Sequence, residues 1–284
     1  MMPSPPARLI VGCGYLGSRV AARWLAEGSS VHAITRSASR AADLASRGIK
    51  PIVADVTRAE TIRNLPGVAT LFWAVGFDRT SGASHHDVHV TGLARVLDAL
   101  PGQPRPILSS STGVWGDERG GIVDETTPAN PSRDAGRVLL EAEELVRSHR
   151  LGPGVALRFA GLYGPDRLPR LADLEAGRPL AADPDSWLNL IHVDDAAAIV
   201  CAVAAAAAPA PLYVVSDGHP VRRRDWYGHI ATCLGSPPPI WDTTAPRSRG
   251  ADKRVDPSRL FRDLPIRLTH PDSLATITDL VRKA

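Results

Sequence analysis

Residues 12–17 have the composition and spacing of a phosphate-binding turn. They read Gly-Cys-Gly-Tyr-Leu-Gly, a G-x-G-x-x-G pattern that directly follows a short apolar run and directly precedes a helical pattern. In such a pattern the first glycine permits a tight turn, the second lets the backbone approach a pyrophosphate, and the third allows close packing of helix on strand. Free N–H groups at the helix start then bind the phosphates. The residues expected to contact a dinucleotide are Gly12, Gly14, Tyr15, Leu16 and Gly17.

The residues that follow the second apolar run bear on the choice of dinucleotide. An acidic residue about 20 positions after the glycines usually holds the adenosine ribose. Here residues 34–37 read Ile-Thr-Arg-Ser, Arg40 follows one turn later, and no carboxylate is present. Because Arg36 and Arg40 are suited to bind a 2′-phosphate, we expect NADP in preference to NAD. The alternative is that both arginines are exposed residues at a helix start.

Two further groups of reactive side chains are poorer candidates for chemistry. His85, His86 and His89 stand beside Asp87, and the first and last of these histidines share a helical face. We expect no metal there, because the cluster lies at a loop-to-helix junction and a nucleotide site of this type needs none. The serines at 109–111 lack the G-x-S-x-G elbow of a hydrolase. Neither a metal centre nor a serine nucleophile is expected.

Apolar runs typical of strands alternate with helical patterns through the first two hundred residues, which is the order of a parallel sheet with crossover helices. The predicted strands are Leu9–Val11, Val31–Ile34, Ile52–Ala54, Leu71–Val75, Ile107–Leu108, Val155–Phe159 and Leu212–Val215. The predicted helices are Ser18–Glu27, Ala38–Arg47, Val88–Leu100, Gly136–His149 and an alanine-rich helix capped by Asp194. This pattern predicts an α/β fold with a Rossmann-type, doubly wound parallel sheet.

A change of composition indicates a second, smaller lobe. Residues 1–164 and 188–216 are expected to form the dinucleotide-binding domain, and residues 165–187 and 217–284 a discontinuous C-terminal substrate lobe. Arginines of this lobe are candidates for binding a substrate diphosphate, with exposed surface charge as the alternative. They are Arg222, Arg223, Arg224, Arg247 and Arg249.

Composition excludes several classes of protein. The chain has 284 residues, 44% of them hydrophobic, and a net charge of +3 with basic and acidic residues interspersed, so we expect no nucleic-acid partner. Its three cysteines are far apart and form no C-x-x-C pair, which favours a reducing compartment over a disulfide framework. The longest stretch of low polarity, residues 196–208, is too short to cross a bilayer. A cytoplasmic protein without membrane partners is expected.

Several short motifs occur in a characteristic order along nearly the whole chain. After the glycine loop come Asp55-Val56, Ala74-Val75-Gly76, Ser109–Gly116, Arg158–Pro165, Asn189–Asp195 and Lys253-Arg254-Val255. In this order the chain resembles the extended short-chain dehydrogenases/reductases, and among them the nucleotide-sugar epimerases and dehydratases. The resemblance implies that Asp55 meets the adenine amino group. It also implies that the cofactor contacts Val56, Ala74, Val75 and Gly76.

The resemblance also locates the family's catalytic positions, and most of them have changed. In the family a tyrosine exchanges a proton with the substrate, a lysine four residues later lowers the tyrosine pKa, a serine binds the substrate hydroxyl, and an asparagine supports the lysine. The serine falls on Ser111, but the tyrosine falls on Ala135, the lysine on Leu139 and the asparagine on His89. No tyrosine or lysine occurs in residues 77–159, so no shift of register restores the pair. The chain is thus similar to the atypical branch of the family.

Substitutes for the missing pair are few. Arg137 is a candidate hydrogen-bond donor to cofactor or substrate, with a surface pair to Glu141 as the alternative. Tyr163 and Asp134 are candidate acids, and Tyr163 equally suits a packing role in its loop.

Two functions are consistent with these residues. The first is an NAD(P)-binding, epimerase/dehydratase-like oxidoreductase that acts on a hydroxyl or carbonyl compound such as a nucleotide-linked sugar. The second is an NADP-binding sensor or scaffold without turnover. A small-molecule substrate and a full substrate lobe favour the first, and the loss of both proton-transfer residues favours the second. The resemblance also allows a homodimer formed through helices of the central domain.

Overall fold

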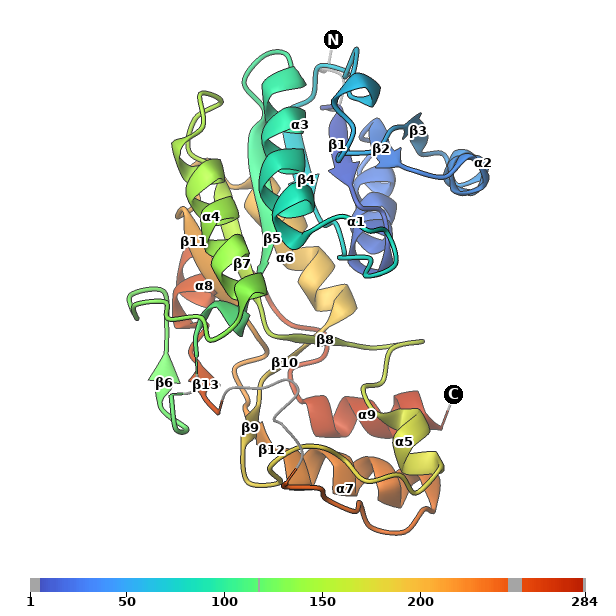
Figure 1. The fold of residues 1–284 in the computed structure, drawn as a ribbon, viewed down its shortest axis with the longest axis vertical. Coiled ribbons are helices and arrows are strands. Elements are labelled where there is room, and N and C mark those ends of the chain that lie inside the picture. Colours follow the sequence, from blue (N-terminus) through green and yellow to red (C-terminus); the bar gives the residue numbers. More distant parts are fainter. Residues whose placement is uncertain (1–5, 117, 245–251, 283–284) are drawn as a thin grey trace.

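The computed structural model describes residues 6–116, 118–244 and 252–282. Seven parallel strands form a central sheet in the order β11-β7-β5-β4-β1-β2-β3 (Figure 1). These strands are β1 (Arg8–Val11), β2 (Val31–Thr35), β3 (Lys50–Val53), β4 (Thr70–Trp73), β5 (Arg105–Ser111), β7 (Val155–Phe159) and β11 (Leu212–Val215). The chain moves outward from β1 through β2 and β3, then returns to the other side of β1 with β4. The predicted Rossmann-type fold is confirmed.

Helices cover both faces of the sheet. They are α1 (Tyr15–Ala26), α2 (Ala38–Ser46), α3 (Leu93–Ala99), α4 (Asp134–Ser148), α6 (Val193–Ala205) and α8 (Ser258–Asp263), with short helical segments η1 (Ala59–Thr61), η2 (Asp87–Gly92) and η3 (Thr112–Val114). Helices α1 and α6 pack against each other on one face, and α3 and α4 lie on the other. Alternation along β1 explains this: Ile10 enters the core under α1 and α6, whereas Leu9 and Val11 enter the opposite core.

Smaller elements lie below the sheet in Figure 1. They are β6 (Ile122–Val123), β8 (Gly161–Tyr163), β9 (Trp187–Leu188), β10 (Leu190–His192), β12 (Val221–Arg222), β13 (Arg254–Val255), α5 (Leu171–Glu175), α7 (Arg223–Leu234) and α9 (Ser273–Val281). Helices α5, α7 and α9 share an apolar core around Trp226 and Ile230. In contrast, Leu260 and Leu264 of the C-terminal segment enter the core beside the sheet.

Three local predictions need correction. Strand β5 is longer than predicted and reaches Ser111, because it pairs with β7 through its serines. The helix predicted from residue 88 begins as a π-helical segment, η2, before α3. Asp194 does not cap the alanine-rich helix: the cap is His192, whose Nδ1 accepts from the Asp194 N–H, and Asp194 lies in the first turn.

A buried ion pair fixes α4 against the sheet. The Arg158 guanidinium, on β7, donates to both carboxylate oxygens of Glu143 at 2.7 and 3.0 Å, and Ser110 on β5 donates to the same carboxylate at 2.5 Å. The two charged side chains are 7% and 11% exposed. The guanidinium also lies over the Trp115 ring at 4.6 Å. Because both charges are desolvated, removing one leaves the other uncompensated.

Replacement of one partner is therefore expected to be costly. We expect Glu143→Gln to lower the free energy of unfolding by about 3 kcal/mol, measured by urea denaturation. Glu144→Gln is the matched control, because its partner Arg147 is exposed on the same helix and its loss should leave stability unchanged. Equal losses in the two variants would contradict a structural role for the buried pair.

Candidate functional site

The glycine loop lies where β1 ends, beside the end of β4. Gly12 has φ +90°, and a Cβ there would lie 2.5 Å from the Ala74 carbonyl oxygen. A Cβ on Gly17 would lie 2.5 Å from the Gly12 carbonyl oxygen. Both approaches are too close for any side chain, so the loop and the first turn of α1 pack backbone to backbone. The reasons given for these glycines from the sequence correspond to observed contacts.

The start of α1 is open to an anion. It has no side-chain cap and no acidic residue in its first turn, and a Cβ on Gly14 would meet nothing within 4 Å. A cavity of about 330 Å³ lies against this loop. It includes most of the predicted contacts: Gly12, Gly14, Arg36, Asp55, Val56, Ala74, Val75 and Gly76. Uncapped N–H groups and open space above a glycine are what a bound pyrophosphate requires, so the residues fit a dinucleotide.

Both predicted arginines line this cavity, and both have partners. Arg36 donates to Asp78 at 3.0 Å, while Arg40 donates to Asp43 at 2.6 Å and to the Cys13 carbonyl at 3.0 Å. Hydrogen bonds from Thr80, and then from Arg36, lower the Asp78 pKa to about 2. Asp78 is therefore ionised at neutral pH. The Arg36–Asp78 pair is exposed, so a phosphate can compete for the guanidinium at little cost.

Asp55 has one carboxylate oxygen engaged within its own turn. Its Oδ1 accepts from the Thr57 N–H at 2.9 Å and from the Thr57 hydroxyl at 2.7 Å. These bonds orient the carboxylate at the cavity wall. Its Oδ2 accepts no hydrogen bond from the described residues, which suits contact with an amino group.

Ser111 ends β5 at the same edge of the sheet as the glycine loop. Its Oγ accepts from the Gly113 N–H at 3.0 Å and caps η3, which fixes the hydroxyl while leaving its proton free to donate. A Cβ on Gly136 would lie 3.0 Å from the Gly113 carbonyl oxygen. The first turn of α4 is therefore held directly against the Ser111 loop.

The α4 positions that matter for proton transfer carry little chemistry. Leu139 packs against an apolar cluster that contains Val114 and Trp115. Arg137 is exposed and forms its ion pair with Asp134. The expected alternative pair with Glu141 is wrong, because Glu141 contacts His86 at 3.3 Å instead. Both Arg137 and Asp134 are free to reorient toward a ligand, since neither is held by packing.

Tyr163 lies in the interior of the smaller lobe. It is 0% exposed, packs edge-on against His192 and Trp226, and its hydroxyl has no hydrogen-bond partner among the described residues. Burial raises its pKa above the usual value. These contacts fit the packing role that the sequence left open.

Comparison with known proteins agrees with the geometry of the loop and the sheet. The model of the NAD dependent epimerase/dehydratase family matches residues 9–216. The chain belongs to this family. Within the described residues, no helix has the length and apolar composition that a membrane crossing requires.

Three proteins show the range of this similarity. Protein YeeZ of Escherichia coli strain K12 is 37% identical over 175 residues, and the matched region spans 60% of this chain and 60% of YeeZ. A Stigmatella aurantiaca protein named 4-hydroxy-2-methyl-3-oxo-4-farnesyl-3,4-dihydroquinoline-1-oxide ketoreductase is 29% identical over 231 residues, 76% of this chain and 69% of that protein. A solved structure from Methylobacillus flagellatus, classed with the NAD-dependent epimerases/dehydratases, is 30% identical with a TM-score of 0.77, covering 99% of both chains.

His89 lies on the π-helical segment η2. It is 7% exposed, and its Nδ1 has no partner among the described residues. Its ring lies 5.8 Å from that of His85, which stacks on Phe77 at 3.6 Å. Burial, and then the charge of His85, lower the His89 pKa to about 4. The imidazole is therefore neutral at physiological pH.

The sequence did not indicate a contact between aromatic and basic residues in the smaller lobe. Trp187 lies beneath two guanidinium groups, that of Arg222 at 3.8 Å and that of Arg254 at 5.4 Å. Arg223 and Arg224 bond instead to Ser186 and Asp185. The remaining predicted arginines, Arg247 and Arg249, lie outside the described residues.

His192, Asp195 and His270 form a cluster whose atoms are close enough to hold a metal ion. Their acceptor groups already have partners: Asp195 accepts from the backbone N–H groups of Thr269 and His270 at 2.8 and 2.9 Å. The two imidazole rings stack at 3.6 Å. This arrangement ties the C-terminal segment to the start of α6.

The low pKa of His89 predicts a pH-dependent stability. In the unfolded chain this histidine protonates near pH 6.5, whereas in the folded protein it does so near pH 4. The contribution of the neutral imidazole to the free energy of unfolding is therefore complete above pH 6.5 and is lost as pH falls toward 4. Between pH 6.5 and 4 we expect the free energy of unfolding of the His89→Asn variant to fall less steeply than that of the unaltered protein. The difference in slope should be up to about 1.4 kcal/mol per pH unit. Urea denaturation at several pH values measures this slope in the His89→Asn variant and in the unaltered protein. An unchanged slope in the His89 variant would contradict a buried neutral imidazole.

Proposed function

We propose that this chain binds NADP and catalyses hydride transfer to or from a small hydroxyl or carbonyl compound. The observation that carries this proposal is that the open start of α1, the arginine-rimmed cavity and Ser111 all lie at the carboxyl edge of one parallel sheet. Ligands of doubly wound sheets bind at this edge, where the strand order reverses.

Each residue has a role in this proposal. The loop at 12–17 binds the pyrophosphate, Asp55 contacts the adenine, and Arg36 and Arg40 exchange their carboxylate partners for the 2′-phosphate. The nicotinamide, when bound, accepts or supplies the hydride. Ser111 donates a hydrogen bond to the reacting oxygen of the substrate, its orientation fixed by the Gly113 N–H.

The second proton-transfer partner is not a tyrosine in this proposal. Arg137 turns from Asp134 toward the substrate oxygen and stabilises developing negative charge, while the proton itself comes from water. Arginine suits the electrostatic part because its charge is permanent, and its high pKa excludes it as the proton donor.

Two substrate classes are consistent with these residues. Trp187 with Arg222 and Arg254 offers a flat aromatic surface and two positive charges, which favours a nucleotide-linked compound. The Stigmatella aurantiaca relative is named as the ketoreductase of a 3-oxo-dihydroquinoline oxide, a ketone fused to an aromatic ring. An aromatic or nucleotide-linked carbonyl compound satisfies both observations.

A non-catalytic NADP sensor is the second candidate. The packing of Leu139 in an apolar cluster favours it, because the lysine position is filled by a core residue. In this case the cavity still binds the cofactor, and the position of the smaller lobe reports whether the cavity is occupied.

Cofactor preference follows from the two cavity arginines. We expect Arg36→Ala together with Arg40→Ala to weaken NADP binding by about 100-fold and NAD binding by less than twofold, measured by isothermal titration calorimetry. Arg47→Ala is the matched control, because Arg47 ends the same helix and contacts the same Asp43 at 4.0 Å. Tighter binding of NAD than of NADP by the unaltered protein would overturn the NADP assignment.

Turnover separates the enzyme from the sensor. With nucleotide-linked and aromatic ketones as substrates, we expect Ser111→Ala to reduce kcat/KM about 100-fold at unchanged NADPH affinity, followed by nicotinamide absorbance. Arg137→Ala should also lower kcat, whereas Arg147→Ala, which removes the corresponding i,i+3 surface pair at the other end of α4, should not. Tight NADP binding without hydride transfer to any of these ketones supports the sensor.

A further inference from the structure

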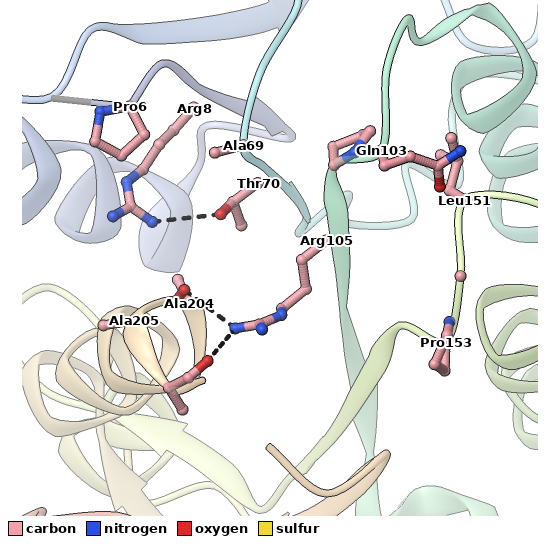
Figure 2. Close-up of a pocket in the computed structure, with 13 residues that line it drawn as sticks. Pro6, Arg8, Ala69, Thr70, Gln103, Arg105, Leu151, Pro153, Ala204 and Ala205 are labelled. Carbon is pink, nitrogen blue, oxygen red and sulfur yellow. Dashed lines mark hydrogen bonds between the residues drawn. The ribbon is translucent and has the colours of Figure 1, made fainter. Parts of the chain in front are cut away.

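A second cavity lies at the opposite edge of the central sheet. It has a volume of about 440 Å³ and is lined by the starts of β1, β4 and β5, the turn before β7 and the end of α6 (Figure 2). The amino ends of parallel strands meet at one edge and their carboxyl ends at the other, so the length of the strands separates this cavity from the cofactor site. Neither function proposed above uses it.

Three polar residues form a row across this edge. Arg8 on β1 is in register with Thr70 on β4, and Thr70 is in register with Arg105 on β5. Neighbouring strands are about 4.8 Å apart, and side chains in register point to the same face of a sheet. Figure 2 shows Thr70 between the two arginine side chains, with a bond from Arg8 to its hydroxyl.

Arg8 is a buried cation with no carboxylate at salt-bridge distance among the described residues, and Glu27 acts on it only through its charge at longer range. Arg8 is 8% exposed, and its guanidinium donates to the Ser29 hydroxyl at 3.3 Å and to the Thr70 hydroxyl at 3.4 Å, both long for hydrogen bonds. It lies over the Trp24 ring at 4.9 Å and forms no ion pair with any described residue. Arg158, buried to the same degree, has both oxygens of Glu143 as acceptors. The two buried arginines therefore differ in that Arg8 has N–H donors left without a charged acceptor.

Arg105 makes the cavity more positive. Its Nη1 donates to the carbonyls of Val203, Ala204 and Ala206 at 3.1, 3.2 and 2.5 Å, at the end of α6. The carboxyl end of a helix carries partial negative charge, which would repel an anion, and this guanidinium compensates it. The residues that line the cavity include no aspartate or glutamate.

Keeping a buried arginine without a counterion has a cost that an apolar residue would avoid. We propose that Arg8, Thr70 and Arg105 bind a phosphate group, either free or on a small phosphomonoester. The planar guanidinium of Arg8 donates to two phosphate oxygens, Thr70 donates its hydroxyl proton to a third, and Arg105 supplies charge. This site is separate from the pyrophosphate site of the glycine loop.

The indole of Trp24 gives a local probe for this site, because the glycine loop also attracts phosphate. Its N–H has no partner among the described residues and the ring lies under Arg8. We expect inorganic phosphate to move the Trp24 indole N–H resonance along a saturating curve in the full chain, with Trp24→Phe used to assign the signal. Sodium chloride at matched ionic strength should leave the position of this resonance unchanged.

Two variants test which residues bind. Arg8→Met should weaken the phosphate response at least tenfold while the protein keeps its circular dichroism spectrum. Thr70→Val removes a second donor and should also weaken the response, to a smaller degree. Arg47→Met, an exposed change of equal charge, should leave the response intact. A linear response, an equal response to chloride, or full retention in Arg8→Met and Thr70→Val would overturn the proposal.

The two sources of phosphate are distinguished by a further titration. Tighter binding of glycerol phosphate than of inorganic phosphate assigns the site to a phosphomonoester, and the reverse assigns it to free phosphate. Stability adds an independent check: in phosphate-free buffer Arg8→Met should unfold at the same or a higher urea concentration than the unaltered protein. A large loss of stability would instead identify Arg8 as a structural residue and contradict a ligand-binding role. Because the reporter is Trp24, none of these results depends on NADP binding or turnover.

Discussion

The close approach of the glycine loop to the ends of β1 and β4 determines the layout of the cofactor half. Side chains are excluded at Gly12 and Gly17 because the backbone of the loop touches the backbone of β4 and of itself. This contact directs the uncapped start of α1 toward the point where the strand order reverses. The cavity forms there because the crossovers leave β1 and β4 in opposite directions, so no connection covers the gap between them.

Helix α4 is held in place by residues other than those at positions 135 and 139. Its position depends on the buried Glu143–Arg158 pair and on the close contact of Gly136 with Gly113. Neither Ala135 nor Leu139 takes part in those contacts. Residues 135 and 139 are therefore not what fixes the position of the helix, and the apolar packing of Leu139 adds to the core beside Trp115.

Hydrophobic alternation and the glycine spacing were sufficient to predict the sheet, its helices and the cofactor loop. They did not predict contacts that depend on the tertiary structure. The last residues of β5, Ser109–Ser111, are polar and carry no hydrophobic signal, although the strand pairs with β7 there and Ser110 donates to the Glu143 carboxylate. The Arg36–Asp78 pair joins residues 42 positions apart, and no local pattern reveals such a partner. The π-helical turn at η2 has no sequence signal that separates it from an α-helix.

The first turn of α1 connects the cofactor loop to the rest of the molecule. The Tyr15 hydroxyl donates to the Pro165 carbonyl at 3.0 Å, and Arg19, one turn later, pairs with Asp194 at 2.9 Å. Asp195, next in sequence, holds the C-terminal segment through the backbone N–H of Thr269. The same helical turn that presents N–H groups to a pyrophosphate thus also contacts the chain leading into the smaller lobe. One of these polar contacts reaches the chain that leads into the smaller lobe and the other reaches the start of α6, so this turn is joined to both parts of the molecule.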